Sequence, residues 1–184
     1  MSTQNDTDQI MIDIETLSTN SNAAILSIGA VLFNVNSKKI TGKFEIAIRM
    51  ESSITYGHIS PETVNWWMQK TSAARKEATK GEDNSLLSAL CHLENWIKTN
   101  CDPQLVKIWA KSPEFDLVIL SNAYKRFNKP PPWDYYNQRD VRTAFDFAKT
   151  ILNMTPKATL PENKKHIAIE DAHIQAQQIM EIYA

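Results

Sequence analysis

Three apolar stretches in the first third of the chain constrain the fold more than any other feature. They cover residues 9–14, 24–34 and 40–49. The first two are rich in isoleucine and other large apolar residues, and the third alternates apolar with polar residues, as a half-exposed strand does. The polar link at residues 35–39 is short enough for a hairpin. Consecutive strands of this kind predict an antiparallel meander.

Helical patterns dominate the rest of the chain. Ser60-Pro61-Glu62 is a helix start, with an N-cap residue, a proline at the first helical position and an acid in the first turn. One further strand is predicted at residues 105–110. Helices are predicted at residues 61–70, 72–79, 84–98, 114–127, 139–152 and 167–182. A strand that follows helices can join the meander in parallel by a crossover. These elements predict one α/β domain over residues 1–184, with a mixed sheet flanked by helices.

The charge balance limits the kind of nucleic-acid contact that this chain can make. The 20 Lys and Arg residues face 21 Asp and Glu residues, which gives a net charge of −1. A protein that coats nucleic acid is normally basic, so any contact here is expected to be local, such as a grip on one strand end. The two cysteines lack metal-ligand spacing, and reduced thiols in the cytoplasm are expected. No apolar signal core or membrane span is predicted.

Two carboxylates fall on the first predicted strand. Asp13 and Glu15 alternate with Ile12 and Ile14, so the two acids share the face opposite the isoleucines. Side chains two residues apart on a strand lie about 7 Å apart, which suits coordination of a hard cation. Taken alone, Asp-x-Glu is better explained as part of a solvated strand face, because the tripeptide is common.

Further acids occur near the predicted starts of two helices. Asp116 follows the strand at residues 105–110, where an acid also complements the helix dipole. His166 and Asp171 lie at the start of the last predicted helix, where a surface histidine and a capping acid are the simpler interpretation. The remaining histidines lack such a context and are predicted to be surface or core residues: His58, His92 and His173.

The order of these groups resembles the DEDDh family of 3′–5′ exonucleases, which have a ribonuclease-H-like fold. That family has Asp-x-Glu on its first strand, Phe-Asp after a middle strand and His-x4-Asp near its end. The matching residues here are Asp13-Ile-Glu15, Phe115-Asp116 and His166 with Asp171, across nearly the whole chain. Within the family, the chain is most similar to exonuclease-VIII-like enzymes of phages and prophages, which are related to small bacterial exoribonucleases. That similarity includes residues 22–30, 66–67, 109–113 and 137–143.

The resemblance implies a hydrolase that releases nucleoside 5′-monophosphates from the 3′ end of single-stranded DNA or RNA. Asp13, Glu15, Asp116 and Asp171 would hold two Mg²⁺ ions, for which Mn²⁺ would substitute. His166 would be the general base, because a neutral imidazole accepts a proton near pH 7. Four clustered carboxylates repel one another without metal, so some of their pKa values are expected to rise.

Six residues are expected to contact the substrate: Thr16, Leu17, Trp66, Trp67, Ser112 and Phe115. Thr16 and Leu17 match the place where the family wedges a side chain against the terminal base. One of the two tryptophans is expected in the core, and stacking on a base is a hypothesis for the other. Many relatives carry an asparagine near the position of Ser112, so contacts in that region are expected to differ.

Three questions stay open at this level. A non-catalytic binding module with the same fold and a hydrolase that cuts internally are the alternative functions. The sequence does not choose between DNA and RNA, because the contacts to the 2′-hydroxyl are unknown. A homodimer is an open alternative to a monomer. The expected location is the cytoplasm, which is that of a bacterial host if the protein is encoded by a phage.

Overall fold

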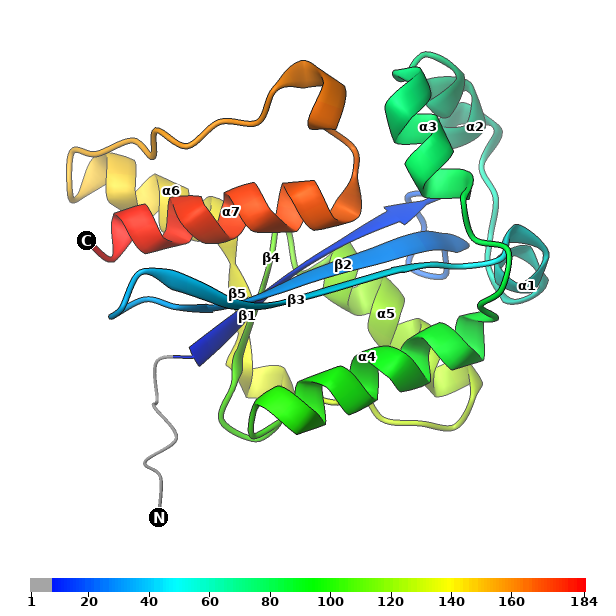
Figure 1. The fold of residues 1–184 in the computed structure, drawn as a ribbon, viewed down its shortest axis with the longest axis horizontal. Helices are drawn as coiled ribbons and strands as arrows, with labels where there is room; N and C mark the ends of the chain where they lie inside the picture. The colour runs from blue at the N-terminus through cyan, green and yellow to red at the C-terminus, as the bar shows by residue number, and fades with distance from the viewer. Residues whose placement is uncertain (1–7) are drawn as a thin grey trace.

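Five strands form one mixed sheet in the computed structural model, which describes residues 8–184 (Figure 1). The strands are β1 (Asp8–Thr16), β2 (Ile25–Asn34), β3 (Lys39–Ala47), β4 (Lys107–Ala110) and β5 (Gln138–Asp140). Their order across the sheet is β3-β2-β1-β4-β5. β1, β2 and β3 pair antiparallel, whereas β4 pairs in parallel with both β1 and β5. The predicted meander with parallel strands added to it is therefore confirmed.

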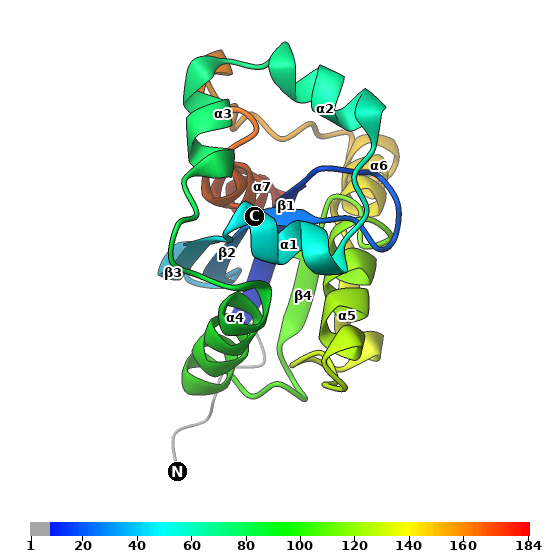
Figure 2. The ribbon, with the colours of Figure 1, turned by 90° about the vertical axis from the view of Figure 1, so that its right-hand side faces the viewer.

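Seven α-helices surround the sheet within the described residues. They are α1 (Met50–Tyr56), α2 (Pro61–Met68), α3 (Ser72–Thr79), α4 (Leu86–Asn100), α5 (Asp116–Arg126), α6 (Val141–Thr150) and α7 (Ala168–Ile182). α4 and α5 cover one face of the sheet, and α6 and α7 cover the other (Figures 1 and 2). The first three helices lie near the end of the sheet toward which β1 points. At this end of the sheet, β1 therefore lies near α1, α2 and α3.

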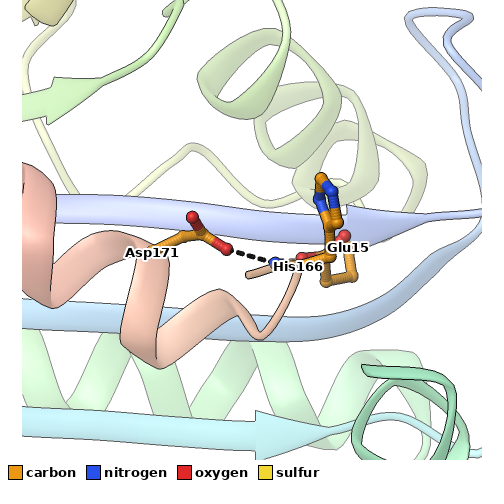
Figure 3. A group of neighbouring side chains, drawn as sticks. All are labelled: Glu15, His166 and Asp171. Carbon is orange, nitrogen blue, oxygen red and sulfur yellow. Dashed lines mark hydrogen bonds between the residues drawn. The ribbon is translucent and has the colours of Figure 1, made fainter. Parts of the chain in front are cut away.

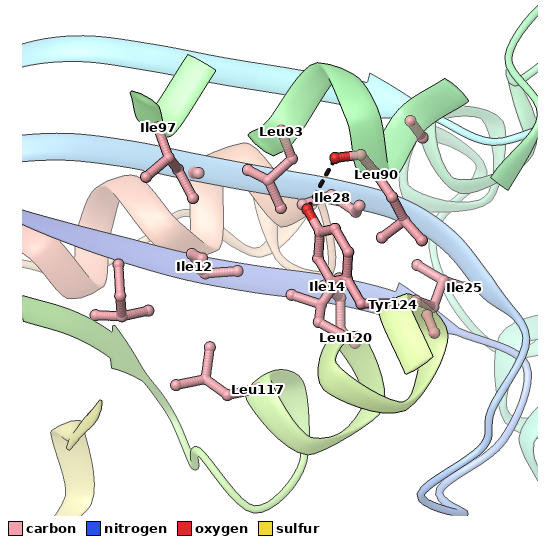
Figure 4. Close-up of a cluster of buried hydrophobic side chains, with 14 of the residues drawn as sticks. Ile12, Ile14, Ile25, Ile28, Leu90, Leu93, Ile97, Leu117, Leu120 and Tyr124 are labelled. Atoms are coloured by element: carbon pink, nitrogen blue, oxygen red, sulfur yellow. Dashed lines mark hydrogen bonds between the residues drawn. The ribbon is translucent and has the colours of Figure 1, made fainter. Parts of the chain in front are cut away.

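The two faces of β1 belong to different cores. Ile12 and Ile14 pack in the core that includes side chains of α4 and α5 (Figure 4). Met11 packs on the opposite face with residues of α7. Because side chains alternate along a strand, Asp13 and Glu15 follow Met11 on the α7 face. On this face of β1, the apolar core ends at Met11, and the two acids follow it along the strand.

Besides two short 3₁₀ helices, Tyr135–Asn137 and Glu162–Lys164, two elements were not predicted from the sequence. α1 begins at Met50, directly after β3. The predicted helix at residues 139–152 is wrong at its start, because Gln138–Asp140 pairs with β4 as strand β5. The helix begins at Val141, and the Asp140 carboxylate caps it by accepting hydrogen bonds from the next backbone N–H groups. The other predicted elements agree with the structure to within two residues at either end.

Gly29 in β2 lets the start of α7 approach the sheet beside the acids. Gly29 pairs with Asp13 across the β1–β2 ladder. A Cβ atom on Gly29 would lie 2.3 Å from the carbonyl carbon of Ala168 and from the backbone nitrogen of Ile169. Both of these atoms are backbone, so they cannot move aside as a flexible side chain would. The sheet and α7 are therefore in direct main-chain contact at this point.

Gly29→Ala is expected to destabilise the protein by about 1–3 kcal/mol, which is the usual cost of overpacking a tight contact. For a chain of this size, that corresponds to a fall in Tm of about 2–4 °C per kcal/mol. Thermal unfolding followed by circular dichroism measures the change. Gly42→Ala is the matched control, because a Cβ at Gly42 would have its nearest neighbour at 3.4 Å. Equal melting temperatures for the two variants would show that the contact at Gly29 is not tight.

The sequence predicted neither a secretory signal nor a membrane span. The absence of a secretory signal was predicted from N-terminal residues that lie largely outside the described part of the chain. Within residues 8–184, none of the helices combines the length and the apolarity that crossing a bilayer requires.

Candidate active site

Four carboxylates and one imidazole from distant parts of the sequence line a single pocket of about 1040 Å³. Asp13 and Glu15 come from β1, and Asp116 is the first residue of α5. His166 lies in the segment before α7, and Asp171 lies in the first turn of that helix. The structure therefore brings together all five residues that the sequence predicted to be catalytic.

Asp116 closes a gap in the hydrogen bonding of β1. The pairing of β1 with β4 ends at Met11 and Trp109, so the edge of β1 beyond Met11 has no strand beside it. There, Asp116 Oδ1 accepts a hydrogen bond from the backbone N–H of Ile14 at 3.1 Å. The N-terminus of α5 is thus attached to the strand that carries the other two acids.

Asp171 holds the segment that carries His166. Its Oδ2 accepts hydrogen bonds from the backbone N–H groups of His166 at 2.7 Å and Ile167 at 3.2 Å (Figure 3). His166 has a φ of 61°, a conformation that is uncommon for residues other than glycine. The His166 ring also contacts the ring of Trp66 edge to face, with centroids 4.7 Å apart. Asp171 therefore holds the backbone of His166, and Trp66 contacts its imidazole ring.

Burial raises the pKa of each of the four acids that converge from β1, α5 and α7: Asp13, Glu15, Asp116 and Asp171. The pKa of Asp13 is well above its usual range, because Asp13 is buried and because the neighbouring acids repel its charge. Burial, with repulsion from Asp171 and Asp116, raises the pKa of Glu15 to about 8. Burial raises the pKa of Asp116 to about 7 and also raises that of Asp171. The expected rise in pKa is found for all four acids, although burial, and not the expected mutual repulsion, is its largest cause.

The donor atoms of the pocket fit a divalent cation. Glu15, His166 and Asp171 each offer one ligand atom, and these atoms lie within 4.8 Å of one another (Figure 3). Carboxylate oxygens are the ligands that hard cations prefer. Burial and the repulsion between neighbouring acids disfavour the ionised forms of Asp13 and Glu15, and bound cations would offset both effects.

Gln175 belongs to the pocket but was not predicted. Its Nε2 donates a hydrogen bond to Asp13 Oδ1 at 3.0 Å, although its own Oε1 is buried without a partner among the described residues. Gln175 lies one helical turn after Asp171 and therefore on the same face of α7. This spacing of four residues is the one sequence signal for Gln175, and it is too common on helices to identify the residue.

Two cations also line the pocket. Lys111 follows β4, and Arg142 lies in the first turn of α6. Arg142 favours the ionised form of Asp116 and Lys111 that of Asp171, so each limits the rise in pKa of its neighbour. Neither side chain has a salt bridge to any residue in the described part of the chain. Both remain available to an anionic ligand.

The predicted substrate contacts divide into two groups. Thr16, Trp66 and Phe115 line the pocket. The other three are not part of its lining: Leu17, Trp67 and Ser112. Leu17 and Trp67 pack together in a third apolar core, and Trp67 Nε1 donates a hydrogen bond to the Thr16 carbonyl at 2.8 Å. The Ser112 carbonyl accepts hydrogen bonds from the first backbone N–H groups of the α5 region. One tryptophan is therefore in the core, as expected.

This fold and site define a class of enzymes, the DEDDh 3′–5′ exonucleases. A family model described as the 3′–5′ exoribonuclease Rv2179c-like domain matches residues 8–183. The chain therefore belongs to this family, and it is a 3′–5′ exonuclease. Membership implies the use of divalent metal ions.

Known nucleases are similar to this chain in sequence or in fold. The chain is 27% identical to an exodeoxyribonuclease of Enterobacteria phage T4 over 187 residues, which cover 88% of this chain and 82% of the phage protein. The nuclease domain of 3′hExo, a DEDDh family member bound to rAMP, superimposes with a TM-score of 0.63 at 11% identity, covering 95% of this chain and 90% of that domain. E. coli exonuclease I in complex with a dT13 oligonucleotide gives 0.67 at 13% identity, over 96% of this chain but only 41% of exonuclease I. At these identities, the structural likeness supports the fold alone.

Proposed function

We propose that this protein removes nucleotides from the 3′ end of single-stranded DNA or RNA in a magnesium-dependent reaction and releases nucleoside 5′-monophosphates. The observation that carries the proposal is the convergence of Asp13, Glu15, Asp116, Asp171 and His166 in one pocket. The bound molecules of two similar structures, rAMP and dT13, are of the expected chemical class.

The four acids would hold the metal. Asp13, Glu15, Asp116 and Asp171 provide oxygen ligands for two Mg²⁺ ions, and Mn²⁺ would substitute. When bound, two such ions supply the positive charge that stabilises an in-line displacement at phosphorus. Gln175 orients the Asp13 carboxylate through its hydrogen bond. The acids on β1 and at the start of α5 are held rigidly, because Asp116 is bonded to the β1 backbone.

His166 is the proposed general base. Burial lowers its pKa below the usual value, so the imidazole is neutral at pH 7 and accepts a proton from the attacking water. Asp171 fixes the backbone of this residue, and Trp66 contacts its ring. These contacts limit the orientations of the imidazole before the substrate arrives.

Neutral and cationic residues would hold the substrate. Thr16, Trp66 and Phe115 offer surfaces for the nucleotides at the 3′ end, and stacking on an aromatic ring contributes about 1–3 kcal/mol per base. Lys111 and Arg142 would contact the phosphates, because two bound divalent ions would balance four ionised acids and leave these cations free. The family is described as exoribonucleases and the phage relative as an exodeoxyribonuclease, so both substrates are candidates.

A 5′-labelled oligonucleotide tests the reaction directly. With Mg²⁺, the wild type is expected to give a ladder that shortens by one nucleotide at a time from the 3′ end. Asp13→Ala controls for contaminating nucleases, and matched DNA and RNA oligomers establish the preferred sugar. A circular substrate is expected to remain intact. Cutting of the circle would indicate an endonuclease, and a complete lack of shortening would favour a non-catalytic binding module. The homodimer and the cytoplasmic location remain predictions.

A further inference from the structure

A second polar cluster occupies the pocket wall beyond Glu15. Ser18 is buried, whereas Asn20 and His58 are exposed and line the pocket. His58 Nδ1 lies 2.8 Å from Ser18 Oγ and 3.3 Å from Asn20 Nδ2. The sequence alone did not assign any of these three residues to the site. His58 was expected to be an ordinary surface or core histidine, and its place in the pocket requires another explanation.

The hydrogen bonds at His58 Nδ1 determine which ring nitrogen carries the proton. The amide nitrogen of Asn20 can only donate a hydrogen bond. Ser18 Oγ accepts a hydrogen bond from the backbone N–H of Asn20 at 3.1 Å and can still donate its own hydroxyl hydrogen to His58, in agreement with the Asn20 contact. Nδ1 is therefore an acceptor, and the neutral imidazole carries its proton on Nε2. Nε2 has no hydrogen-bond partner among residues 8–184 and is a free donor at the pocket wall.

Backbone contacts hold His58 in this position. Its N–H donates to the Asn22 carbonyl at 2.8 Å, and its carbonyl accepts from the N–H of Ala24 at 2.9 Å. Gly57 allows this close approach, because a Cβ there would lie 2.3 Å from Ala24 Cα. Since the main chain makes these contacts, the exposed imidazole is not needed to pack the segment. A rigid backbone instead presents the ring to the pocket.

The charges of this wall indicate which ligand fits it. The residues of the wall that line the pocket are Thr19, Asn20, His58, Ser60, Pro61, Glu62 and Thr63. Glu62 is the only Asp, Glu, Lys or Arg side chain among them, and a hydrogen bond from Ser60 lowers its pKa, so it is ionised at pH 7. An anionic group would be repelled here, whereas a neutral acceptor would meet the His58 N–H. The wall therefore suits an uncharged nucleoside better than a phosphate.

We propose that His58 determines specificity by donating a hydrogen bond from Nε2 to the uncharged 3′-terminal nucleoside, and that Glu62 disfavours ends that carry a 3′-phosphate. This inference rests on the proposed function, because it assumes that the scissile phosphate lies at the acids. A hydrogen bond to the part of the substrate that does not react is present in both the ground state and the transition state. Its loss therefore raises KM and leaves kcat largely unchanged.

Two substitutions of His58 separate the donor from the structural contacts. The amide of His58→Asn reaches the position of Nδ1, so it can keep the contacts with Ser18 and Asn20 but offers no donor at the position of Nε2. The amide nitrogen of His58→Gln reaches the position of Nε2. His58→Asn is expected to raise KM for an oligonucleotide with a 3′-hydroxyl by about 2- to 10-fold, which corresponds to one hydrogen bond. His58→Gln is expected to recover most of this loss.

Steady-state kinetics on the full chain with Mg²⁺ measures these effects. His92→Asn is the matched control, because His92 is exposed on α4 and is not part of the pocket lining. A His58→Asn enzyme with the wild-type KM would overturn the assignment, and so would a His58→Gln enzyme that is impaired as much as His58→Asn. Wild-type protein that degrades no substrate would instead contradict the proposed function itself, which keeps the two failures distinguishable.

A separate measurement tests whether Glu62 disfavours 3′-phosphate ends. The ratio of kcat/KM for 3′-hydroxyl ends to kcat/KM for 3′-phosphate ends is compared between the wild type and Glu62→Gln. Removing the negative charge is expected to lower this ratio several-fold by improving the use of 3′-phosphate ends. An unchanged ratio would show that Glu62 does not select the terminus.

Discussion

His166→Ala is expected to lower kcat by about 10²- to 10⁴-fold while leaving Mn²⁺ binding intact, because a positioned general base contributes about this much. Burial lowers the pKa of His166, so the wild-type rate should fall only when the pH drops below the usual titration range of histidine. Single-turnover degradation of a labelled oligonucleotide gives the rate at each pH. Calorimetric titration with Mn²⁺ gives the metal affinity of the same variant.

Two outcomes would remove the assignment of His166. An unchanged rate in His166→Ala would show that no proton is transferred to this ring. Loss of Mn²⁺ binding would place the imidazole among the metal ligands, which its distance of at most 4.8 Å from ligand atoms of Glu15 and Asp171 allows. His92→Ala, on the far side of the sheet, is the control and should keep the wild-type rate.

Asp13→Asn is expected to lower activity strongly and to stabilise the metal-free fold. The loss of a metal ligand should lower the rate on the order of 10³-fold, which corresponds to the several kcal/mol that a bound cation contributes to the transition state. The stability effect has the opposite sign, because the amide of the variant carries no charge in a site where burial and three neighbouring acids disfavour the carboxylate. Thermal unfolding in EDTA measures it.

The pH dependence of the melting temperature shows whether the ionised acids destabilise the metal-free fold. A carboxyl group whose pKa is raised by folding binds more protons in the folded state, so stability falls as pH rises between its unfolded and folded pKa values. With folded pKa values of about 8 for Glu15 and about 7 for Asp116, this window extends from about pH 4 to pH 8. The metal-free wild type should therefore lose Tm from pH 5 to pH 8, and Mg²⁺ should reduce the loss by mass action.

Comparison of variants at each pH isolates the contribution of Asp13. Folding lowers the pKa values of His166 and His173, so these two residues make the protein more stable as the pH increases. Their contribution opposes the loss of stability that the acids cause over the same pH range. These contributions are shared by wild type and variant, so the difference in Tm between Asp13→Asn and wild type should grow with pH. Asp146→Asn, at an exposed position on α6, should show no such difference. A lower Tm for metal-free Asp13→Asn at pH 8 would contradict the account.

Strand periodicity and helix starts predicted where the acid side chains lie, and the resemblance to the DEDDh family assigned them to one site. Asp13 and Glu15 share one face of β1 by alternation alone, and Asp116 lies in the first turn of α5, as expected. The resemblance to the DEDDh family added His166 and Asp171, which are too far along the chain for local patterns to connect with β1. Gln175 was missed because a glutamine one turn after an acid is common on helices.

The remaining differences come from contacts that local patterns do not encode. β5 has only polar residues, and its pairing with β4 rather than its own pattern makes it a strand. Residues of α1 such as Ser53 and Thr55 are weak helix formers. His58 has no distinctive neighbours in sequence, and only the packing of Gly57 against Ala24 brings it to the pocket. Leu17 faces the core because Trp67 covers it.

Calorimetric titration of Mn²⁺ into metal-free protein shows whether the carboxylates form a metal site, with wild type and Asp13→Asn compared in the presence of a nucleoside 5′-monophosphate. Wild type is expected to bind two ions per chain, and Asp13→Asn is expected to lose most of this binding while remaining folded. Wild-type protein that binds no Mn²⁺ at millimolar concentration would show that these carboxylates do not form a metal site.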